Sequence, residues 1–369
     1  MSENKGRRVV VKVGTRLLTD ATGNLKLEYI EKLVHELAQL KNEGHELILV
    51  SSGAIGAGVG KLGMTRRPTA IPEKQAAAAV GQGLLIQIYE KYFADYGLVV
   101  AQILLTRSDL ISRRRCINAS NTVLTLLRWG VIPIINENDT VSVEEIKFGD
   151  NDRLSALVAA LIDANLLIIL TTVDGLYDGN PQQEGARLIP VVKKITRDIK
   201  AIAGPSGDDL ATGGMITKLK AAEIVTKSGI GMYIANGTDP TILGRILKGE
   251  QLGTYFQPEK NVLNRRKRWI AYGRVVRGSI VIDDGAKIAL CQGGKSLLPV
   301  GVIQVKGEFK RGDLISVYDR SDNEVGRGLS NFSSEELLLI MRHSSSQIPA
   351  LLGRPAEEEV IHRDNLVVY

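Results

Sequence analysis

Two lysines of this chain occupy positions from which an ammonium group could act on a phosphate. Lys12 interrupts the apolar run VVVKV at residues 9–13, where an unpaired charge would be unfavourable. Lys218 closes the stretch TGGMITK at residues 212–218, where glycines precede a predicted helix. Backbone N–H groups at glycine turns and helix N-termini bind phosphate, and nearby ammonium groups reinforce them. We therefore expect a phosphate site, although the alternative for Lys12 is a lysine on an exposed edge strand.

Acidic and amide side chains lie directly ahead of another predicted helix. The stretch GDNDRL contains Asp150, Asn151 and Asp152. Asp and Asn are common helix caps, so their position alone shows no function. Two carboxylates beside a phosphate site could also orient Mg²⁺ or the lysines. The sequence leaves both interpretations open.

Five predicted strands end in polar or glycine-rich residues. In an open α/β sheet, ligands bind outside the carboxyl ends of the strands. The five ends are Gly14-Thr15, Ser51-Ser52-Gly53, Asn136-Glu137-Asn138-Asp139, Thr171-Thr172-Val173-Asp174-Gly175 and Asn236-Gly237. Such residues also form turns and helix caps, so one such end would mean little. Five ends on one sheet edge instead predict a binding cleft.

Histidine placement narrows the chemistry expected in this cleft. The four histidines are His35, His45, His343 and His362, and none lies at one of these strand ends. Catalysis by a histidine base or by a Cys/His pair is therefore not expected. Phosphoryl transfer to a carboxylate fits better, because a carboxylate with a pKa near ~4.3 is already ionised at neutral pH. Such a reaction needs positioning and charge stabilisation, for which lysines, backbone amides and Mg²⁺ are suited.

The elements that must position these residues alternate between strands and helices up to about residue 255. Apolar residues recur at helical spacing over 27–40, and Gly44 is placed to end that helix. A second helix is predicted over 72–97, a stretch that opens with proline and ends with glycine. The alternation predicts a mainly parallel open sheet with helices on both faces.

The pattern changes near residue 277. The glycine-punctuated stretches GSIVIDDGAKIAL, GVIQVKGEFKRGDLISVYD and EVGRGLSNF predict short strands, and SSEELLLIMRHSS predicts one helix. We therefore predict three parts: a catalytic α/β domain at 1–258, a basic linker at 259–276 and a small, mostly β domain at 277–369.

Two glycine motifs suggest other nucleotide sites but fit them poorly. GVGKLG at 58–63 has the G-x-G-x-x-G spacing of an NAD site, yet it begins eight residues after the predicted strand ends at Val50. GKS within 291–297 lacks the first glycine of a P-loop, because Ala289 stands at that position. We interpret the first as weak evidence for a rival NAD-binding fold and the second as a turn.

Composition and cysteine content bound the class of protein. Of the 369 residues, 44% are hydrophobic and 24% charged, which is typical of globular domains. Cys116 and Cys291 cannot form a disulfide framework, so we expect a cytoplasmic protein. The longest apolar stretch carries Asp163 and Asn165, and the N-terminal apolar run is short, so no membrane span or signal peptide is predicted.

The net charge of +6 is concentrated in one short segment. Residues 259–275 carry six basic residues and one acidic residue, whereas the remainder to residue 369 carries 11 basic and 13 acidic. A basic segment with Trp269 and Tyr272 could contact RNA, but we favour a solvated linker. The net negative charge of the C-terminal part argues against RNA binding there.

Several stretches together resemble a known family. VVVKVGT, VSSGAIGAG, INENDTV, FGDNDRLSALVA and TGGMITKLKAA, in this order, are similar to the glutamate 5-kinase family of the amino acid kinase superfamily. NRRKRWI and GKSLLPVGV are similar to its appended PUA domain, so the resemblance spans essentially the whole chain. It implies the amino acid kinase fold and transfer of the ATP γ-phosphoryl group to the side-chain carboxylate of L-glutamate, the step that opens proline biosynthesis. It further implies Mg²⁺ carried mainly by the ATP phosphates, inhibition by proline and a homo-oligomer, either a dimer or a tetramer.

The resemblance also implies roles for individual residues. Lys12 and Lys218 are the cations that stabilise the transferred phosphoryl group, and Asp150 organises them. The positions that contact glutamate match Ser52, Asp139 and Asn151. The positions that contact ATP match Lys12, Thr171, Thr172, Thr212, Gly213, Gly214, Met215, Ile216, Thr217 and Lys218.

Thr172 departs from the family pattern, which has an aspartate there. The change removes a carboxylate from the expected nucleotide site, and Asp174, two residues on, could substitute in part. Two rival functions remain: a kinase of the same fold acting on aspartate, acetylglutamate or a carbamate, and an RNA-binding protein that uses the PUA-like domain.

Overall fold

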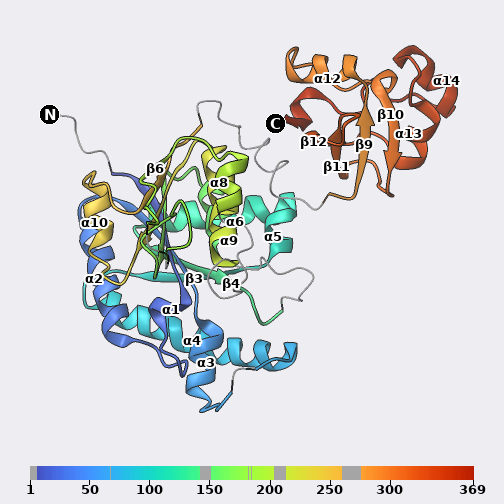
Figure 1. The fold of residues 1–369 in the computed structure, drawn as a ribbon. Helices are drawn as coiled ribbons and strands as arrows, with labels where there is room; N and C mark the ends of the chain where they lie inside the picture. Colours follow the sequence, from blue (N-terminus) through green and yellow to red (C-terminus); the bar gives the residue numbers. More distant parts are fainter. Residues whose placement is uncertain are drawn as a thin grey trace. The chain divides into compact units, whose positions relative to one another are not determined.

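The chain forms two compact units, Met1–Val262 and Leu263–Tyr369. The computed structural model describes residues 6–66, 68–141, 151–181, 183, 185–202, 213–259 and 276–369. Nearly all of the predicted basic linker lies outside these residues. Each unit contains its own sheet (Figure 1).

The described residues of the N-terminal unit build one large sheet. Its eight strands are β1 (Arg8–Val13), β2 (Glu46–Ser51), β3 (Val100–Leu105), β4 (Ile132–Glu137), β5 (Leu166–Thr171), β6 (Val191–Val192), β7 (Gly231–Asn236) and β8 (Thr254–Phe256). Their order across the sheet is β3-β4-β2-β1-β5-β7-β8-β6, and of these pairs only β7 and β8 run antiparallel. The prediction of a mainly parallel sheet is confirmed.

Helices cover both faces of this sheet. They are α1 (Thr15–Leu18), α2 (Leu27–Asn42), α3 (Ala54–Lys61), α4 (Ile71–Ala94), α5 (Arg107–Ile111), α6 (Arg113–Arg128), α7 (Asn151–Leu161), α8 (Arg197–Ile202), α9 (Gly213–Thr226) and α10 (Ile242–Leu247). Apolar residues of α2, α4 and α10 pack with alternate residues of β1 in one core. The helices α7 and α9 pack against each other, and against β1 and β7 respectively.

The two helices predicted over 27–40 and 72–97 are present. The first is α2, and Gly44 behind it has φ +92°, a conformation that glycine adopts without strain. The second is α4, which carries a proline in its first turn. Within the described part of the chain, no helix combines the length and the apolarity needed to cross a membrane.

The glycines of the GVGKLG motif lie mainly on α3 and serve helix packing. A Cβ atom at Gly58 would lie only 1.8 Å from the carbonyl oxygen of Ala77, and one at Gly81 would lie 1.8 Å from that of Ala54. The two glycines thus let α3 and α4 approach until backbone meets backbone. Gly58 of the motif is therefore explained by helix packing, without a dinucleotide.

The described residues of the C-terminal unit form a five-stranded sheet with short helices. The strands are β9 (Gly278–Ile282), β10 (Val302–Lys306), β11 (Leu314–Tyr318), β12 (Glu324–Leu329) and β13 (Leu366–Val368), in the order β10-β9-β11-β12-β13. The helical elements are α12 (Asp284–Cys291), η2 (Pro299–Gly301), α13 (Ser334–Ile340), η3 (Ser345–Gln347), α14 (Ile348–Leu352) and η4 (Arg363–Asn365). The predicted helix is α13, which Ser333 and Glu336 cap reciprocally.

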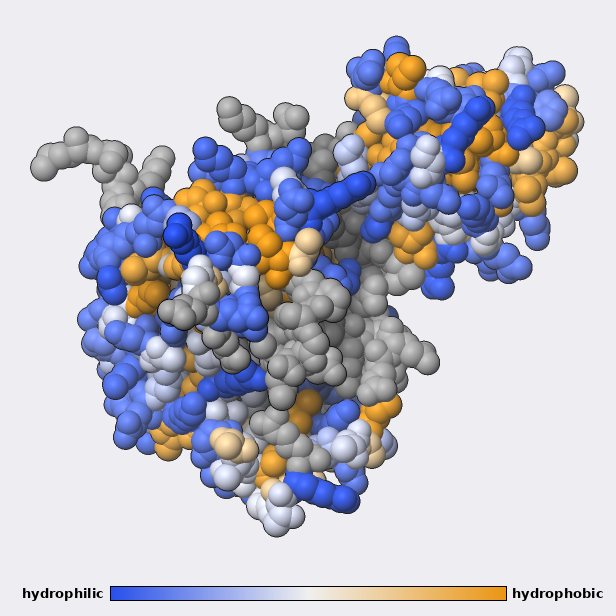
Figure 2. Space-filling view, in the orientation of Figure 1, coloured by the Kyte–Doolittle hydropathy of each residue, from blue (hydrophilic) through white to orange (hydrophobic). Residues whose placement is uncertain are grey.

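One part of the prediction for this unit is wrong. The second half of GSIVIDDGAKIAL is the helix α12 and not a strand. Asp283 follows β9 and caps the helix, because its Oδ1 atom accepts a hydrogen bond from the Ala286 N–H at 2.7 Å. Leu338 and Leu339 on α13 are exposed apolar side chains. Figure 2 shows hydrophobic residues on the surface of this unit.

Candidate active site

Three charged side chains from three elements meet near the carboxyl end of the central strand β1. Lys12 lies on β1, Asp152 in the first turn of α7 and Lys218 in the second turn of α9. Lys12 Nζ is 2.7 Å from Asp152 Oδ1, and Lys218 Nζ is 3.0 Å from Asp152 Oδ2. Their exposed fractions are 4%, 0% and 7% for Lys12, Asp152 and Lys218. One buried carboxylate therefore holds both ammonium groups.

The packing of each element places these side chains. Along β1, Val11 and Val13 face the core shared with α2 and α4, so Lys12 between them faces the opposite side, where α7 lies. On α9, Lys218 Nζ donates to the Gly214 carbonyl at 3.2 Å, and Thr217 Oγ1 donates to Asp152 Oδ2 at 3.0 Å. The first bond lies within α9, and the second ties α9 to the first turn of α7.

The space beside the two ammonium groups suits a phosphoryl group. A Cβ atom at Gly14 would lie 3.9 Å from Lys12 Nζ, and one at Gly214 would lie 3.8 Å from Lys218 Nζ. Two ammonium groups and one carboxylate leave these three side chains with a net positive charge, which favours an anion beside them. Glycine at both positions keeps side-chain atoms out of that space. The residues present therefore fit the phosphates of a nucleotide.

Amide and hydroxyl groups gather on the β2 and β4 side of the cluster. The Asn151 side chain, at the start of α7, has its Nδ2 atom 2.8 Å from the Ser51 carbonyl, 3.0 Å from Ser52 Oγ and 2.8 Å from Asn136 Oδ1. It thus joins the ends of β2 and β4. Asp139 follows β4 at the same edge of the sheet and is half-buried. Three residues predicted to bind glutamate are therefore brought to the ends of two adjacent strands.

The β5 and β7 side of the cluster is more open. Thr171 ends β5 half-buried, and Thr172 is exposed. The exposed Asp174 carboxylate accepts hydrogen bonds from Asn236 Nδ2 at 2.9 Å and from the Tyr177 hydroxyl at 3.0 Å. Asn236 is the last residue of β7.

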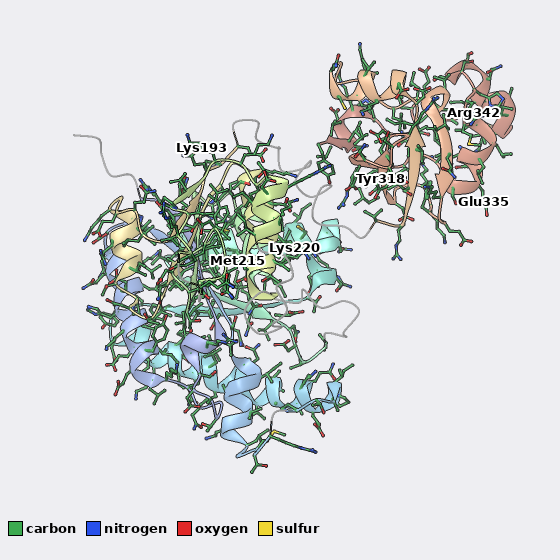
Figure 3. All side chains as sticks on the ribbon, in the orientation of Figure 1. Lys193, Met215, Lys220, Tyr318, Glu335 and Arg342 are labelled. Carbon is green, nitrogen blue, oxygen red and sulfur yellow. The ribbon has the colours of Figure 1, made fainter. Side chains whose placement is uncertain are left out.

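The start of α9 carries most of the predicted nucleotide residues. Gly213 is its first residue, Gly214 is exposed, and Met215, Ile216 and Thr217 are half-buried. Figure 3 labels Met215 and Lys220, which lie on α9.

The strand order arranges these groups in a line along one edge of the sheet. From one side to the other, β4 leads to Asp139, β2 to Ser52, β1 carries Lys12, β5 leads to Thr172 and β7 ends at Asn236. The lysine cluster thus stands between a compact polar side and an open side.

Two predicted site residues, Asp150 and Thr212, lie outside the described residues. The carboxylate that the structure places between the lysines is Asp152, which the sequence offered only as a cap or as one of two orienting carboxylates. Sequence reasoning also gave no separate role to Asn136 or Ser51. The sequence did contain a signal for both residues, because each stands at a polar strand end.

Comparison with known proteins agrees with this fold. Residues 7–236 match the amino acid kinase family, and residues 278–352 match the PUA domain. Among solved structures, a carbamate kinase from Giardia lamblia bound to AMP-PNP has a similar fold, with a TM-score of 0.52 and 17% identity, and the match covers 69% of this chain and 100% of that one. The fold and these matches thus define an amino acid kinase with an added PUA domain.

Relatives that match nearly the whole chain show to which family of amino acid kinases it belongs. A glutamate 5-kinase from Caldanaerobacter subterraneus is 53% identical over 98% of this chain and 97% of its own length. A glutamate 5-kinase from Moorella thermoacetica is 50% identical over 99% of this chain and 97% of its own length. The chain belongs to the glutamate 5-kinase family, and the resemblance found in the sequence is confirmed.

Proposed function

We propose that this chain catalyses the ATP-dependent phosphorylation of the side-chain carboxylate of L-glutamate, which gives L-glutamyl 5-phosphate and opens proline biosynthesis. The observation that carries the proposal is the buried Lys12–Asp152–Lys218 cluster, which stands between the two sides of one sheet edge. Relatives about half identical over nearly the whole chain bear the name of this activity.

The chemistry follows from the charges of the cluster. A glutamate side-chain oxygen forms a bond to the γ-phosphorus as the bond to the β-phosphate oxygen breaks, and ADP leaves. The acceptor is already ionised at neutral pH, so no proton has to be removed first. Lys12 and Lys218 stabilise the negative charge on the moving phosphoryl group from fixed positions. Asp152 keeps both ammonium groups aimed at the same point.

Glutamate occupies the β2 and β4 side in this proposal. Asp139 pairs with the α-ammonium group, and Ser52 and Asn151 contact the rest of the amino acid. The adenine nucleotide occupies the β5 and β7 side, against Thr171, Thr172 and the 212–218 stretch. Asp150, as the resemblance implies, assists in organising the lysines, a role that Asp152 shares.

Mg²⁺ enters the proposal with the nucleotide. This ion commonly binds substrate phosphates through water and few protein ligands, so we assign it mainly to the ATP phosphates. Further proposals from the family resemblance are inhibition by proline, a homo-oligomeric dimer or tetramer, and a cytoplasmic location. The net charge of −2 on the C-terminal part supports a regulatory or assembly role for the PUA domain over RNA binding.

A coupled ADP-release assay tests the proposal. The purified chain, ATP and Mg²⁺ are assayed with glutamate, aspartate and acetylglutamate in parallel. We expect ADP release with glutamate far above the other two acceptors, because only a free α-ammonium group at the correct distance pairs with Asp139. A preference for aspartate or acetylglutamate would overturn the substrate assignment in favour of another kinase of this fold.

A further inference from the structure

Two buried polar side chains of α4 reach strand ends on the proposed glutamate side. The Tyr89 hydroxyl is 3.0 Å from Ser51 Oγ, at the last residue of β2. Gln82 Nε2 donates to the carbonyl of Glu137, the last residue of β4, at 3.2 Å. The side chains are buried, with exposed fractions of 0% for Tyr89 and 6% for Gln82. They stand seven residues apart, about two helical turns, and therefore share one face of α4.

Each contact is made to a residue that stands one or two positions before a residue proposed to bind glutamate. Ser51 precedes Ser52, and its carbonyl accepts a hydrogen bond from the Asn151 side chain. Ser51 Oγ also donates to the Ser52 carbonyl at 3.3 Å. Glu137 stands two residues before Asp139. Shifts of α4 would therefore be passed on to both strand ends.

The position of α4 is itself fixed against this edge of the sheet. The helix α3 begins at Ala54, directly after Ser52 and Gly53. Because Gly58 and Gly81 bring α3 and α4 into backbone contact, any larger residue there would push the helices apart. The strand end, α3 and α4 thus form one closely packed support.

The chemical state of Tyr89 suits a hydrogen-bonding role. Burial raises the pKa of its phenol group, so the hydroxyl keeps its proton at any pH at which the protein works. A second largely buried phenol on α2, Tyr29, has no hydrogen-bond partner for its hydroxyl among the described residues. Burial raises the pKa of Tyr29 as well. Tyr89 is fully buried and Tyr29 half-buried, and of the two only the Tyr89 hydroxyl is hydrogen-bonded to a strand end.

We propose that Tyr89 and Gln82 are positioning residues that hold Ser52 and Asp139 in the geometry required to bind glutamate. This inference rests on the proposed roles of Ser52 and Asp139. Removal of the Tyr89 hydroxyl leaves Ser51 with one hydrogen bond fewer and lets the end of β2 relax. Glutamate affinity should then fall, while the lysine cluster on β1 and the nucleotide side are unaffected.

The test compares Tyr89→Phe with the matched control Tyr29→Phe, each removing one buried hydroxyl. Loss of one buried hydrogen bond should raise the KM for glutamate by about 3- to 10-fold in Tyr89→Phe. The kcat value and the KM for ATP should stay within about twofold, because the groups that act on the phosphoryl group keep their places. Tyr29→Phe should leave all three constants unchanged. Thermal unfolding of both variants shows whether they fold alike.

A second variant keeps the inference testable if Tyr89→Phe does not fold. Gln82→Met retains side-chain length and loses the donor to the Glu137 carbonyl, and it should also raise the KM for glutamate selectively. Asp139→Asn distinguishes a failure of the positioning role from a failure of the proposed glutamate site. If Asp139→Asn raises this KM while Tyr89→Phe and Gln82→Met do not, the positioning role is wrong and the proposed site stands. If Asp139→Asn has no effect either, the proposed glutamate site itself is wrong.

Discussion

Asn151 and Thr172 stand on opposite sides of the lysine cluster and differ in what surrounds them. The Asn151 amide lies within hydrogen-bond distance of three oxygen atoms at the ends of β2 and β4. Tyr89 and Gln82 of α4 form hydrogen bonds to residues at the same strand ends. Thr172 is exposed. Nearby, the Asp174 carboxylate is held by Asn236 and Tyr177 at the surface.

The difference indicates how each side binds its ligand. On the glutamate side, a lost contact leaves a buried polar group without a partner, which costs about 1–3 kcal/mol. On the nucleotide side, water can replace a lost contact. Substitutions should therefore have large, specific effects on glutamate and small effects on ATP, with the largest effects at the lysines that both sides share.

Removal of either shared lysine should produce the largest effect. Lys12→Met and Lys218→Met keep an apolar chain of similar length and remove the ammonium group. Each should lower kcat by roughly 10²- to 10⁴-fold, because a preorganised charge is lost in the transition state. The KM for glutamate should move little. Steady-state kinetics of both single variants and the double variant check this, and the double variant should lose less than the product of the two single losses. An increase in KM with normal kcat would show that Lys12 only binds substrate.

Asp152→Asn should have the next largest effect. The amide keeps the shape of the carboxylate but removes the negative charge between two buried ammonium groups, which then repel each other. We expect kcat to fall by roughly 10²- to 10³-fold, together with a lower unfolding temperature. Kinetics and thermal unfolding measure the two losses. A variant with normal kcat would mean that the two ammonium groups stay correctly oriented without Asp152.

Asp139→Asn tests the glutamate side alone. Loss of the charge that pairs with the α-ammonium group should raise the KM for glutamate by one to two orders of magnitude, or about 1.4–3 kcal/mol. The KM for ATP serves as the internal control and should not change. An unaltered KM for glutamate would remove Asp139 from the amino-group site.

Thr172→Asp tests the open side and should give the smallest effect. The substitution restores the carboxylate of the family pattern, which accepts a stronger hydrogen bond than a hydroxyl group. The KM for ATP should fall and kcat should remain within about threefold, since an exposed contact contributes only about 0.5–1.5 kcal/mol. The companion variant Asp174→Asn tests whether the Asp174 carboxylate substitutes in part for the one that the family has at position 172. A large change of kcat in Thr172→Asp would show that this side takes part in the chemistry.

Local patterns in the sequence predicted much of the fold. The apolar spacing over 27–40 and the proline that opens 72–97 place α2 and α4 correctly, because helix periodicity and end signals depend on residues close in the chain. The prediction failed at α12, where a single capping aspartate, Asp283, turns an apparent strand continuation into a helix. GVGKLG shows the converse, since its spacing resembles a nucleotide loop whereas the structure shows that Gly58 lies on α3 and packs against α4.

The sequence by itself determined which residue types stand at the strand ends, including a lysine within an apolar strand. Only the tertiary structure decided which of them meet. Lys12, Asp152 and Lys218 come from three elements far apart in the chain, and their convergence depends on how α7 and α9 pack on β1 and β7. The contact of Tyr89 with Ser51 likewise depends on the approach of α4 to the sheet. Spacing along a chain cannot encode such distances, because the packing of side chains between elements sets them.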